Sequence, residues 1–138
     1  TGRLVVLVLV AVAVGAAAVW WKRRAAADRR RGADGLPPLP DEWRGDDATW
    51  VVWTAPTCAS CRSLLELLAR RAPEVGVRAV DVTEEPEAAE RYGIQSTPTT
   101  LVATANGEIT HRLVGVDTAR RHLDDVRSGG SPAPRTSR

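Results

Sequence analysis

The chain has 138 residues, a formal net charge of +2, 43% hydrophobic residues and two cysteines. This length suits one small domain with appendages, and two cysteines exclude the disulfide framework that many small secreted domains use. Residues 1–35 carry seven basic and two acidic residues, whereas residues 36–138 carry 12 and 15. This asymmetry favours a basic segment that meets an anionic surface over a basic domain that binds nucleic acid, and no nucleic-acid motif is present.

An uncharged apolar run extends from Leu4 to Trp21 and reads LVVLVLVAVAVGAAAVWW. As a helix it would span about 27 Å, close to the thickness of a bilayer core. The alternatives are a buried core helix and a cleaved signal peptide with its site near residues 16–18. Signal peptides carry their charge before a shorter apolar stretch, but only Arg3 precedes this run and six basic residues follow it. We therefore predict an uncleaved transmembrane anchor over residues 1–24.

Basic residues follow the apolar run at once, at Lys22, Arg23, Arg24, Arg29, Arg30 and Arg31. Because basic residues beside a membrane span prefer the cytoplasmic face, we predict a single-pass membrane protein whose C-terminal domain lies in the cytosol. The cluster could also bind anionic lipid at ~1 kcal/mol per basic residue, so the expected contact with membrane lipid covers residues 4–31. A simple stop-transfer flank predicts the same topology.

Two further segments have no sustained hydrophobic period. Residues 25–47 contain Pro37, Pro38 and Pro40 and are predicted to form a linker that is locally stiffened by polyproline geometry. Residues 128–138, SGGSPAPRTSR, have almost nothing to bury and are predicted to be a disordered tail. The predicted folded domain therefore covers residues 48–127.

The domain should begin with a βαβ unit. The run Trp50–Trp53 is rich in strand formers and predicts a central strand that is covered on both faces. A second strand is expected over residues 75–82, and because the chain must return past an intervening helix, it should run parallel to the first. That helix ends before Pro73 and has an apolar face formed by Cys61, Leu64, Leu65, Leu68, Ala69 and Ala72.

The second half of the domain predicts a short helix, a hairpin and a closing helix. Thr83–Tyr92 has a helix start signal at Pro86 and a stop signal at Gly93. Asn106-Gly107 is a strong hairpin signal between strands at residues 99–105 and 108–114. The closing helix should be capped by Asp117 and face inward through Ala119, Leu123 and Val126. Together these elements predict an α/β fold with a mixed four-stranded sheet flanked by helices.

The stretch TAPTCASC places Cys58 and Cys61 at the junction of the first strand and the first domain helix. A cysteine reacts as its thiolate, and the unpaired amides and dipole of a helix N-terminus stabilise an anionic sulfur. Cys58 would lie at this terminus, and Cys61 would face inward one turn later, within reach of a disulfide. An exposed attacking thiol and a sheltered resolving thiol are the resulting hypothesis.

The cysteines have two other interpretations, a metal site and a pair of structural thiols. A zinc site needs four ligands, and His111 and His122 lie on different predicted elements without the usual short spacing. His111 alternates with Thr110 and Arg112 along a strand, which is typical of a surface side chain. Two purely structural thiols are the simpler alternative, because a lone C-x-x-C is only moderately specific.

Three segments, in this order, resemble the thioredoxin family: VVWTAPTCASCR, DVTEEPEAAERYGI and STPTTLVATANGE. The resemblance covers about Trp50–Val126 and implies a thioredoxin-like fold with thiol-disulfide oxidoreductase activity. It implies that Cys58 is the nucleophile, that Cys61 resolves, and that the Thr97-Pro98 bond is cis and binds substrate. It also implies protein disulfides as substrates, an unidentified electron donor such as a reductase, and no cofactor besides the Cys58–Cys61 disulfide. A monomer is expected.

The sequence departs from the family pattern at three places. Thr57 replaces the usual Trp before the first cysteine, and Ala59-Ser60 replaces the usual Gly-Pro. The buried acid that helps to deprotonate the resolving cysteine falls, by position, on Val52. The missing acid supports one alternative, a redox-inactive binding module that docks a partner at the membrane. Another alternative, an outward-facing reductase of exported or cytochrome-maturation thiols, requires the basic flank to be misleading.

Overall fold

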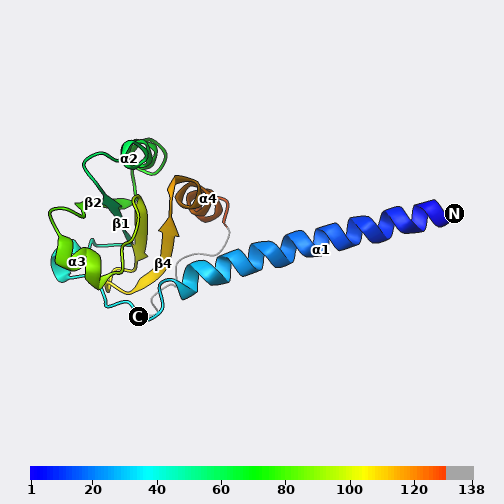
Figure 1. The fold of residues 1–138 in the computed structure, drawn as a ribbon, viewed down its shortest axis with the longest axis horizontal. Coiled ribbons are helices and arrows are strands. Elements are labelled where there is room, and N and C mark those ends of the chain that lie inside the picture. The colour runs from blue at the N-terminus through cyan, green and yellow to red at the C-terminus, as the bar shows by residue number, and fades with distance from the viewer. Residues whose placement is uncertain (130–138) are drawn as a thin grey trace.

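The computed structural model describes residues 1–129, apart from the side chains of residues 25–31 (Figure 1). A long helix, α1 (Gly2–Arg31), leads into a domain in which helices lie on both faces of a four-stranded sheet. The predicted α/β architecture is therefore confirmed. Most of the predicted tail, residues 130–138, lies outside the described residues.

The sheet has the strand order β2-β1-β3-β4. Its strands are β1 (Thr49–Thr54), β2 (Gly76–Asp81), β3 (Thr99–Ala103) and β4 (Ile109–Val114). β1 pairs in parallel with β2 and antiparallel with β3, which in turn pairs antiparallel with β4. The sheet is thus mixed, as predicted. Since β1 is internal and covered on both faces, its first five residues are all buried, which explains its continuous apolar sequence.

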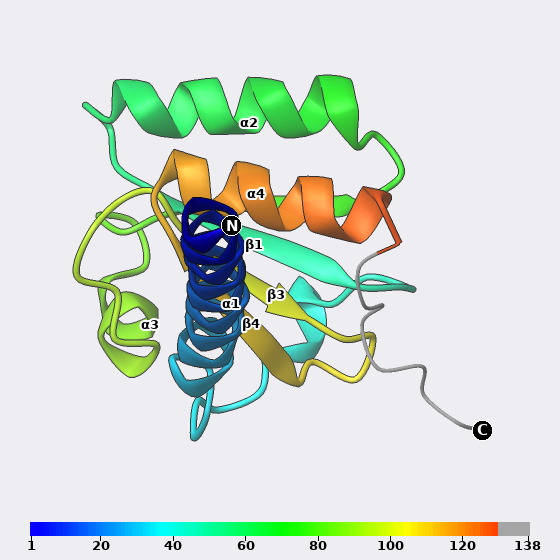
Figure 2. The ribbon, with the colours of Figure 1, turned by 90° about the vertical axis from the view of Figure 1, so that its right-hand side faces the viewer.

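One face of the sheet is covered by α2 (Ala59–Arg71) and α4 (Val116–Arg127), which lie side by side (Figure 2). Their buried side chains form one cluster with the sheet, including Trp50, Val52, Leu64, Leu68, Leu113 and Leu123. Ala69 was predicted to face inward but is exposed. It lies eight residues after Cys61, about 80° further round the helix, and so falls off the buried face.

The other face is covered by α3 (Pro86–Arg91) and by the chain that follows α1. The helix α3 begins at Pro86, as the sequence signal indicated, but the residues before it form a turn. In that turn, the backbone amide and the hydroxyl of Thr83 donate to Asp81 Oδ1 at 2.7 and 2.6 Å. These hydrogen bonds compete with helix formation and explain why the helix is shorter than the predicted Thr83–Tyr92.

Residues 25–47 do not form the linker that the sequence predicted, because part of this segment is helical and part packs into the core. The helix α1 continues to Arg31, and three apolar side chains beyond it, Ala33, Leu39 and Trp43, are 4%, 0% and 8% exposed. Trp43 lies in a 3-10 helix, η1 (Asp41–Trp43), and its ring packs edge-on against Trp53 with 5.8 Å between centroids. The spacing of these three residues follows neither helical nor strand periodicity, and therefore the sequence pattern did not reveal their burial.

The predicted hairpin between β3 and β4 is present, although both strands are shorter than expected. Its tight turn is centred one residue earlier than the predicted Asn106-Gly107, on Ala105 and Asn106, because the Gly107 amide donates to the Thr104 carbonyl at 2.8 Å. Gly107 has φ +84°, which favours glycine, and its carbonyl accepts a hydrogen bond from the Leu39 amide at 2.8 Å. Arg44 Nε donates to the Leu39 carbonyl at 2.8 Å. The chain before the sheet is therefore bonded to the hairpin.

Two predictions for the closing helix are wrong. The residue before α4 is Gly115, with φ +85°, and Asp117 lies inside the first turn, so it does not cap the helix. Val126 is 43% exposed, whereas His122 is 8% exposed. The aromatic ring of Trp50 lies 5.5 Å from the ring of His122, which shows why this position is buried. Ala119 and Leu123 face the core, as predicted.

The first helix, α1, extends away from the domain, and its C-terminal end lies beside β4 (Figures 1 and 2). Over Gly2–Arg24 its most apolar stretch has a mean hydropathy of 2.6, and its side chains are exposed. This segment is long and apolar enough to cross a bilayer, which is the property of a membrane anchor or of a signal sequence.

Candidate active site

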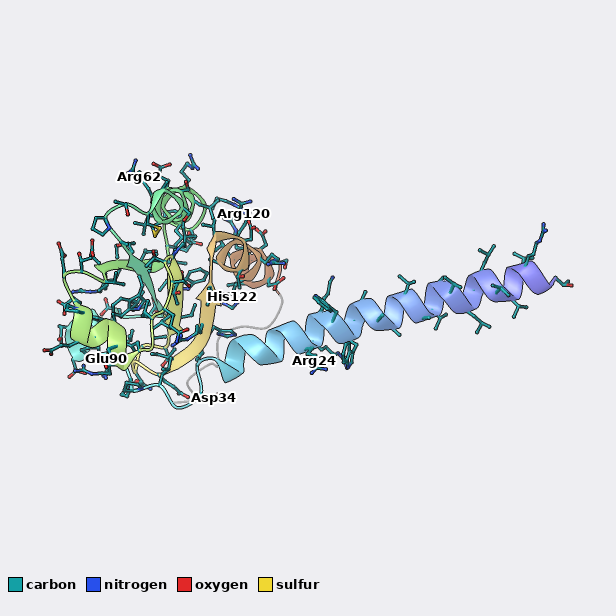
Figure 3. The ribbon with its side chains drawn as sticks, in the orientation of Figure 1. Arg24, Asp34, Arg62, Glu90, Arg120 and His122 are labelled. Carbon is teal, nitrogen blue, oxygen red and sulfur yellow. A yellow bond between two sulfur atoms is a disulfide. The ribbon has the colours of Figure 1, made fainter. Side chains whose placement is uncertain are left out.

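The two cysteines lie at the junction between the end of β1 and the start of α2. The backbone turns after Thr54, with the Cys58 amide donating to the Ala55 carbonyl at 3.1 Å, and Cys58 is the N-cap residue of the helix. A disulfide joins Cys58 to Cys61, with 5.3 Å between their Cα atoms. The sulfur atoms lie beside α2, whereas Arg62 of the same turn points to solvent (Figure 3).

The sulfur of Cys58 receives polar contacts from its own helix. It accepts a hydrogen bond from the Cys61 amide at 3.2 Å, in place of the oxygen that usually caps a helix. The Ser60 hydroxyl lies 3.4 Å from the same sulfur. Both groups can donate to a thiolate, and the first turn of α2 has no acidic residue that would repel one. The site is therefore suited to an anionic sulfur at Cys58.

The two sulfurs differ in their access to solvent. Cys58 is partly exposed, whereas Cys61 is 2% exposed and faces the sheet with Leu64 and Leu68. A substrate can thus approach Cys58 but not Cys61. This is the arrangement that the helical spacing predicted.

The Thr97-Pro98 peptide bond is cis, as the family resemblance implied. Because β3 runs antiparallel to β1, the chain that enters β3 meets the sheet at the same end as the chain that leaves β1, and Trp53 pairs with Thr99 there. Pro98 is buried and Thr97 is partly exposed. The cis-proline segment and the dithiol therefore share one end of the sheet.

Arg112 of β4 holds the segment that leads to the cis-proline. Its guanidinium donates to the Gly93 carbonyl at 3.0 Å and to the Tyr92 carbonyl at the end of α3. Burial lowers the pKa of Arg112. The side chain of Thr99 adds a second tie, since its hydroxyl donates to the Ser96 carbonyl at 2.7 Å.

A family model described as Thioredoxin matches residues 44–127, which is more than half of the chain. The chain belongs to the thioredoxin family. The thioredoxin domain carries the C-x-x-C disulfide of a thiol-disulfide oxidoreductase, formed by Cys58 and Cys61. Membership implies protein disulfides as substrates and a reductase as partner.

Several known proteins are similar to this chain in sequence or in fold. The chain is 35% identical to the SPbeta prophage-derived thioredoxin-like protein YosR of Bacillus subtilis over 60 residues, 44% of this chain and 72% of that protein. It is 36% identical to a thioredoxin of Chlamydia trachomatis over 46% of this chain and 61% of that protein. The solved thioredoxin of Trypanosoma brucei brucei superimposes with a TM-score of 0.54 at 22% identity, covering 64% of this chain and 81% of that chain.

The position of the family's buried acid is apolar here. Val52 is 0% exposed and packs among the apolar side chains of α2 and α4. Its partners across the sheet are Ala79 of β2 and Thr100 of β3. No carboxylate therefore stands at this point of the core beneath α2.

The two histidines are close in space although they lie on different elements. Their rings are 4.5 Å apart, with His122 buried and His111 partly buried. Within residues 1–129, however, no group of three or more His, Cys, Asp or Glu side chains is arranged to hold a metal ion. The sequence argument against zinc assumed that the two histidines would be distant because they lie on different elements. The structure shows that β4 and α4 bring them together.

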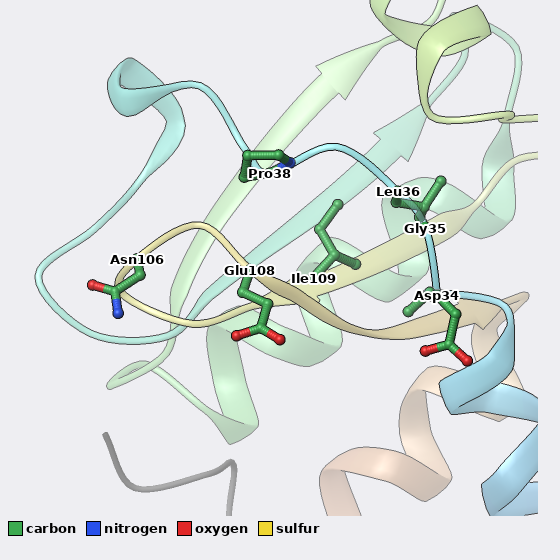
Figure 4. Close-up of a pocket in the computed structure, with 8 residues that line it drawn as sticks. Asp34, Gly35, Leu36, Pro38, Asn106, Glu108 and Ile109 are labelled. Carbon is green, nitrogen blue, oxygen red and sulfur yellow. The ribbon is translucent and has the colours of Figure 1, made fainter. Parts of the chain in front are cut away.

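A hollow of about 240 Å³ lies between the hairpin and the chain after α1 (Figure 4). The side chains of Asp34, Asn106 and Glu108 line it. It is at the hairpin end of the sheet, opposite the end at which β1 leads to Cys58, so it is separate from the dithiol.

Sequence reasoning missed two features of the site. One is the contact between Ser60 and the Cys58 sulfur, for which a hydroxyl two residues after a helix cap was the available signal. The other is Thr100, a threonine at an inward position of a buried strand, whose hydroxyl is fully buried. No pattern in the sequence indicated that second feature, because β3 is buried at every position.

Proposed function

We propose that this thioredoxin-family protein reduces or oxidises protein disulfides through an attacking Cys58 and a resolving Cys61. The observation that carries the proposal is the position of Cys58 at the start of α2, where the residue is partly exposed and its sulfur accepts a hydrogen bond from the Cys61 amide at 3.2 Å. An amide donor and the helix dipole favour the thiolate, and exposure admits a substrate.

In the reductive direction, the Cys58 thiolate attacks one sulfur of a substrate disulfide, forms a mixed disulfide and releases the other substrate sulfur as a thiolate. The Cys61 thiol then loses its proton and displaces the remaining substrate sulfur. The Cys58–Cys61 bond forms as the mixed disulfide breaks. A reductase must supply two electrons to restore the dithiol.

The cis-proline segment supplies the proposed substrate contact. Thr97 is partly exposed, and its backbone groups bond to no other backbone group among residues 1–129. An extended substrate segment could pair with them, while Pro98 is held by its own carbonyl, which accepts the Gly115 amide at 2.9 Å. A substrate segment paired in this way would lie at the same end of the sheet as Cys58.

The full chain in detergent should reduce a model protein disulfide when a chemical reductant supplies electrons. Cys58→Ser should abolish turnover, and Cys61→Ser should accumulate a mixed disulfide through Cys58.

The second candidate function, a redox-inactive binding module, is favoured by the apolar side chain at Val52. Equal turnover by the parent and Cys58→Ser proteins would remove the enzyme function and leave the binding module.

The second part of the proposal is a single-pass anchor over residues 1–24 with the domain on the cytosolic face. It is supported by the exposed apolar helix and by Lys22, Arg23 and Arg24 directly after it. The domain would then act as a monomer, with membrane lipid along α1. After treatment of intact cells with a permeant reductant, an impermeant maleimide should label Cys58 only once the membrane is opened. Labelling before that step would place the domain outside.

A further inference from the structure

The resolving step needs a thiolate at Cys61, whose surroundings are closed to solvent. Removing a thiol proton in an apolar environment is unfavourable unless a polar group stabilises the resulting charge. The question is which group does this, since Val52 occupies the position of the acid. The following inference rests on the proposed role of Cys61.

The row of side chains that contains Val52 can be read from the strand register. Val52 pairs with Ala79 on one side and with Thr100 on the other, and Thr100 pairs with Leu113. Residues directly opposite each other project from the same face of a sheet. Val52 and Leu113 belong to the core beneath α2 and α4, so Thr100 projects toward the same helices.

This row lies at the dithiol end of that face. Moving along β1 toward Cys58, it is the last row on this side in which all four strands are paired. The helix α2 begins at the same end, and its inward residues follow in the order Cys61, Leu64 and Leu68. Thr100 therefore carries the one polar side chain of the row nearest to the start of α2.

The hydroxyl of Thr100 has no hydrogen-bond partner among the described residues. The residue is 0% exposed, and its Oγ1 is one of four buried side-chain polar atoms in residues 1–129 without a partner. Burying a hydroxyl without a partner is unfavourable, so such an atom requires an explanation. Its neighbour Thr99 shows the usual solution, because that hydroxyl donates to a backbone carbonyl.

We propose that the Thr100 hydroxyl hydrogen-bonds the Cys61 sulfur once the disulfide is open, and so favours ionisation of this thiol where the family's acid is missing. The Cys61 thiol gives its proton to water, and the hydroxyl donates to the thiolate that remains. The thiolate then attacks the Cys58 sulfur, and the substrate sulfur leaves with the bonding electron pair and is protonated by water. Thr100 itself neither gains nor loses a proton.

The resolving step can be isolated with the full chain in detergent. Reduced protein is treated with a limiting amount of 5,5′-dithiobis(2-nitrobenzoate), which forms a mixed disulfide at Cys58, and release of the second coloured thiolate is followed from pH 5 to 10. Thr100→Val keeps the shape of the side chain and removes the hydroxyl. A charge-assisted hydrogen bond predicts release that is about tenfold slower and a pH midpoint about one unit higher.

Thr104→Val is the matched control, because Thr104 Oγ1 is also buried and unpartnered but lies at the hairpin end of the sheet. It should leave both the rate and the pH midpoint unchanged, and Thr100→Ser should restore the parent values. Thr100→Ala provides a second hydroxyl deletion should the valine variant not fold.

The outcomes separate the two proposals. If Cys61→Ser traps the mixed disulfide while Thr100→Val and Thr100→Ala release it like the parent, the role of Thr100 is overturned and that of Cys61 stands. If Cys61→Ser itself releases the second thiolate at the parent rate, the proposed function is overturned. An equal slowing by Thr104→Val would also contradict the inference, because it would show a general effect on the sheet.

Discussion

The two ends of the sheet differ in how their polar groups are bonded. At the hairpin end, the Leu39 amide bonds the Gly107 carbonyl, and Arg44 bonds the Leu39 carbonyl and an Asp41 carboxylate at 2.6 Å. At the dithiol end, the hydrogen-bond partners of the Cys58 sulfur among the described residues come from its own helix turn, namely the Cys61 amide and the Ser60 hydroxyl. A hydrogen bond between distant parts of the chain fixes the hairpin end, whereas the polar surroundings of the reacting sulfur come from its local helix turn.

The largest expected effect is on stability at the hairpin end. Leu39→Ala removes a side chain that is 0% exposed in the core beside α3, and it should lower the free energy of unfolding by about 2–5 kcal/mol. Urea denaturation of the full chain in detergent measures this change. Val126→Ala, at a position that is 43% exposed, should cost much less. Equal losses for the two variants would contradict the burial of the segment before β1.

Gly107→Ala should cost about 2–3 kcal/mol, because alanine is strained at positive φ and its Cβ would collide with the Arg44 guanidinium. Gly35→Ala is a matched control, since Gly35 has φ +78° but open space around the added carbon. The loss of stability in Gly35→Ala should therefore report the backbone strain alone, without a steric clash. Denaturation midpoints give both values, and thiol exchange by the folded Gly107→Ala protein should be unchanged. A larger loss for Gly35→Ala would argue against the contact with Arg44.

Ser60→Ala should act on reactivity at the dithiol end and leave stability alone. Loss of the hydroxyl 3.4 Å from the Cys58 sulfur should raise the pKa of that thiol and slow its alkylation near pH 7 about threefold. The pH dependence of iodoacetamide labelling in a Cys61→Ser background measures this. Ser63→Ala is the control, because that hydroxyl bonds the Ala59 carbonyl. An unchanged labelling profile for Ser60→Ala would leave the cap amide as the main donor.

The smallest effect at neutral pH concerns Tyr92, which connects α3 to the hairpin-end segment through its hydroxyl and the Pro38 carbonyl at 3.0 Å. Burial raises the pKa of Tyr92. Its contribution to stability is therefore complete below about pH 10, where the unfolded side chain ionises, and falls as pH rises through the folded value. Denaturation of the oxidised protein at increasing alkaline pH tests this.

The chain has no other tyrosine, so Tyr92→Phe should flatten that alkaline decline. A Tyr92→Phe protein that loses stability with the same pH dependence as the parent would show that another group is responsible. Tyr92 packs beside Trp53 and bonds the Pro38 carbonyl. Thiol-disulfide exchange by the Tyr92→Phe protein should not change if the dithiol end works independently of the hairpin end.

Regular patterns made the fold and the dithiol predictable from the sequence. The continuous apolar run of β1, the helical spacing after Cys61 and the Asn106-Gly107 hairpin signal each depend on local rules, and the structure contains the strand, the helix and the hairpin. The positions of Cys58 and Cys61 follow from the same helix. Local structure alone was sufficient to place one sulfur at the surface and the other inside.

Contacts between distant residues were not predictable in this way. Leu39 is buried because the Gly107 turn and the α3 face meet it, which no period in residues 33–43 indicates. His122 is buried because it meets Trp50, whereas Val126, at an equally suitable helical position, meets nothing that buries it. The lack of a hydrogen-bond partner for the buried Thr100 hydroxyl is likewise evident only from the assembled sheet.

If α1 is anchored in a bilayer, the short stretch of chain between α1 and the core fixes the distance of the dithiol from the membrane. Gly32 alone separates the last residue of α1 from the buried Ala33. From Lys22 to Arg31 the helix rises about 15 Å, more than the depth of one headgroup layer. On an anchored chain the domain would stand just clear of the lipid at a nearly constant height, and a partner would have to bring its disulfide to that level.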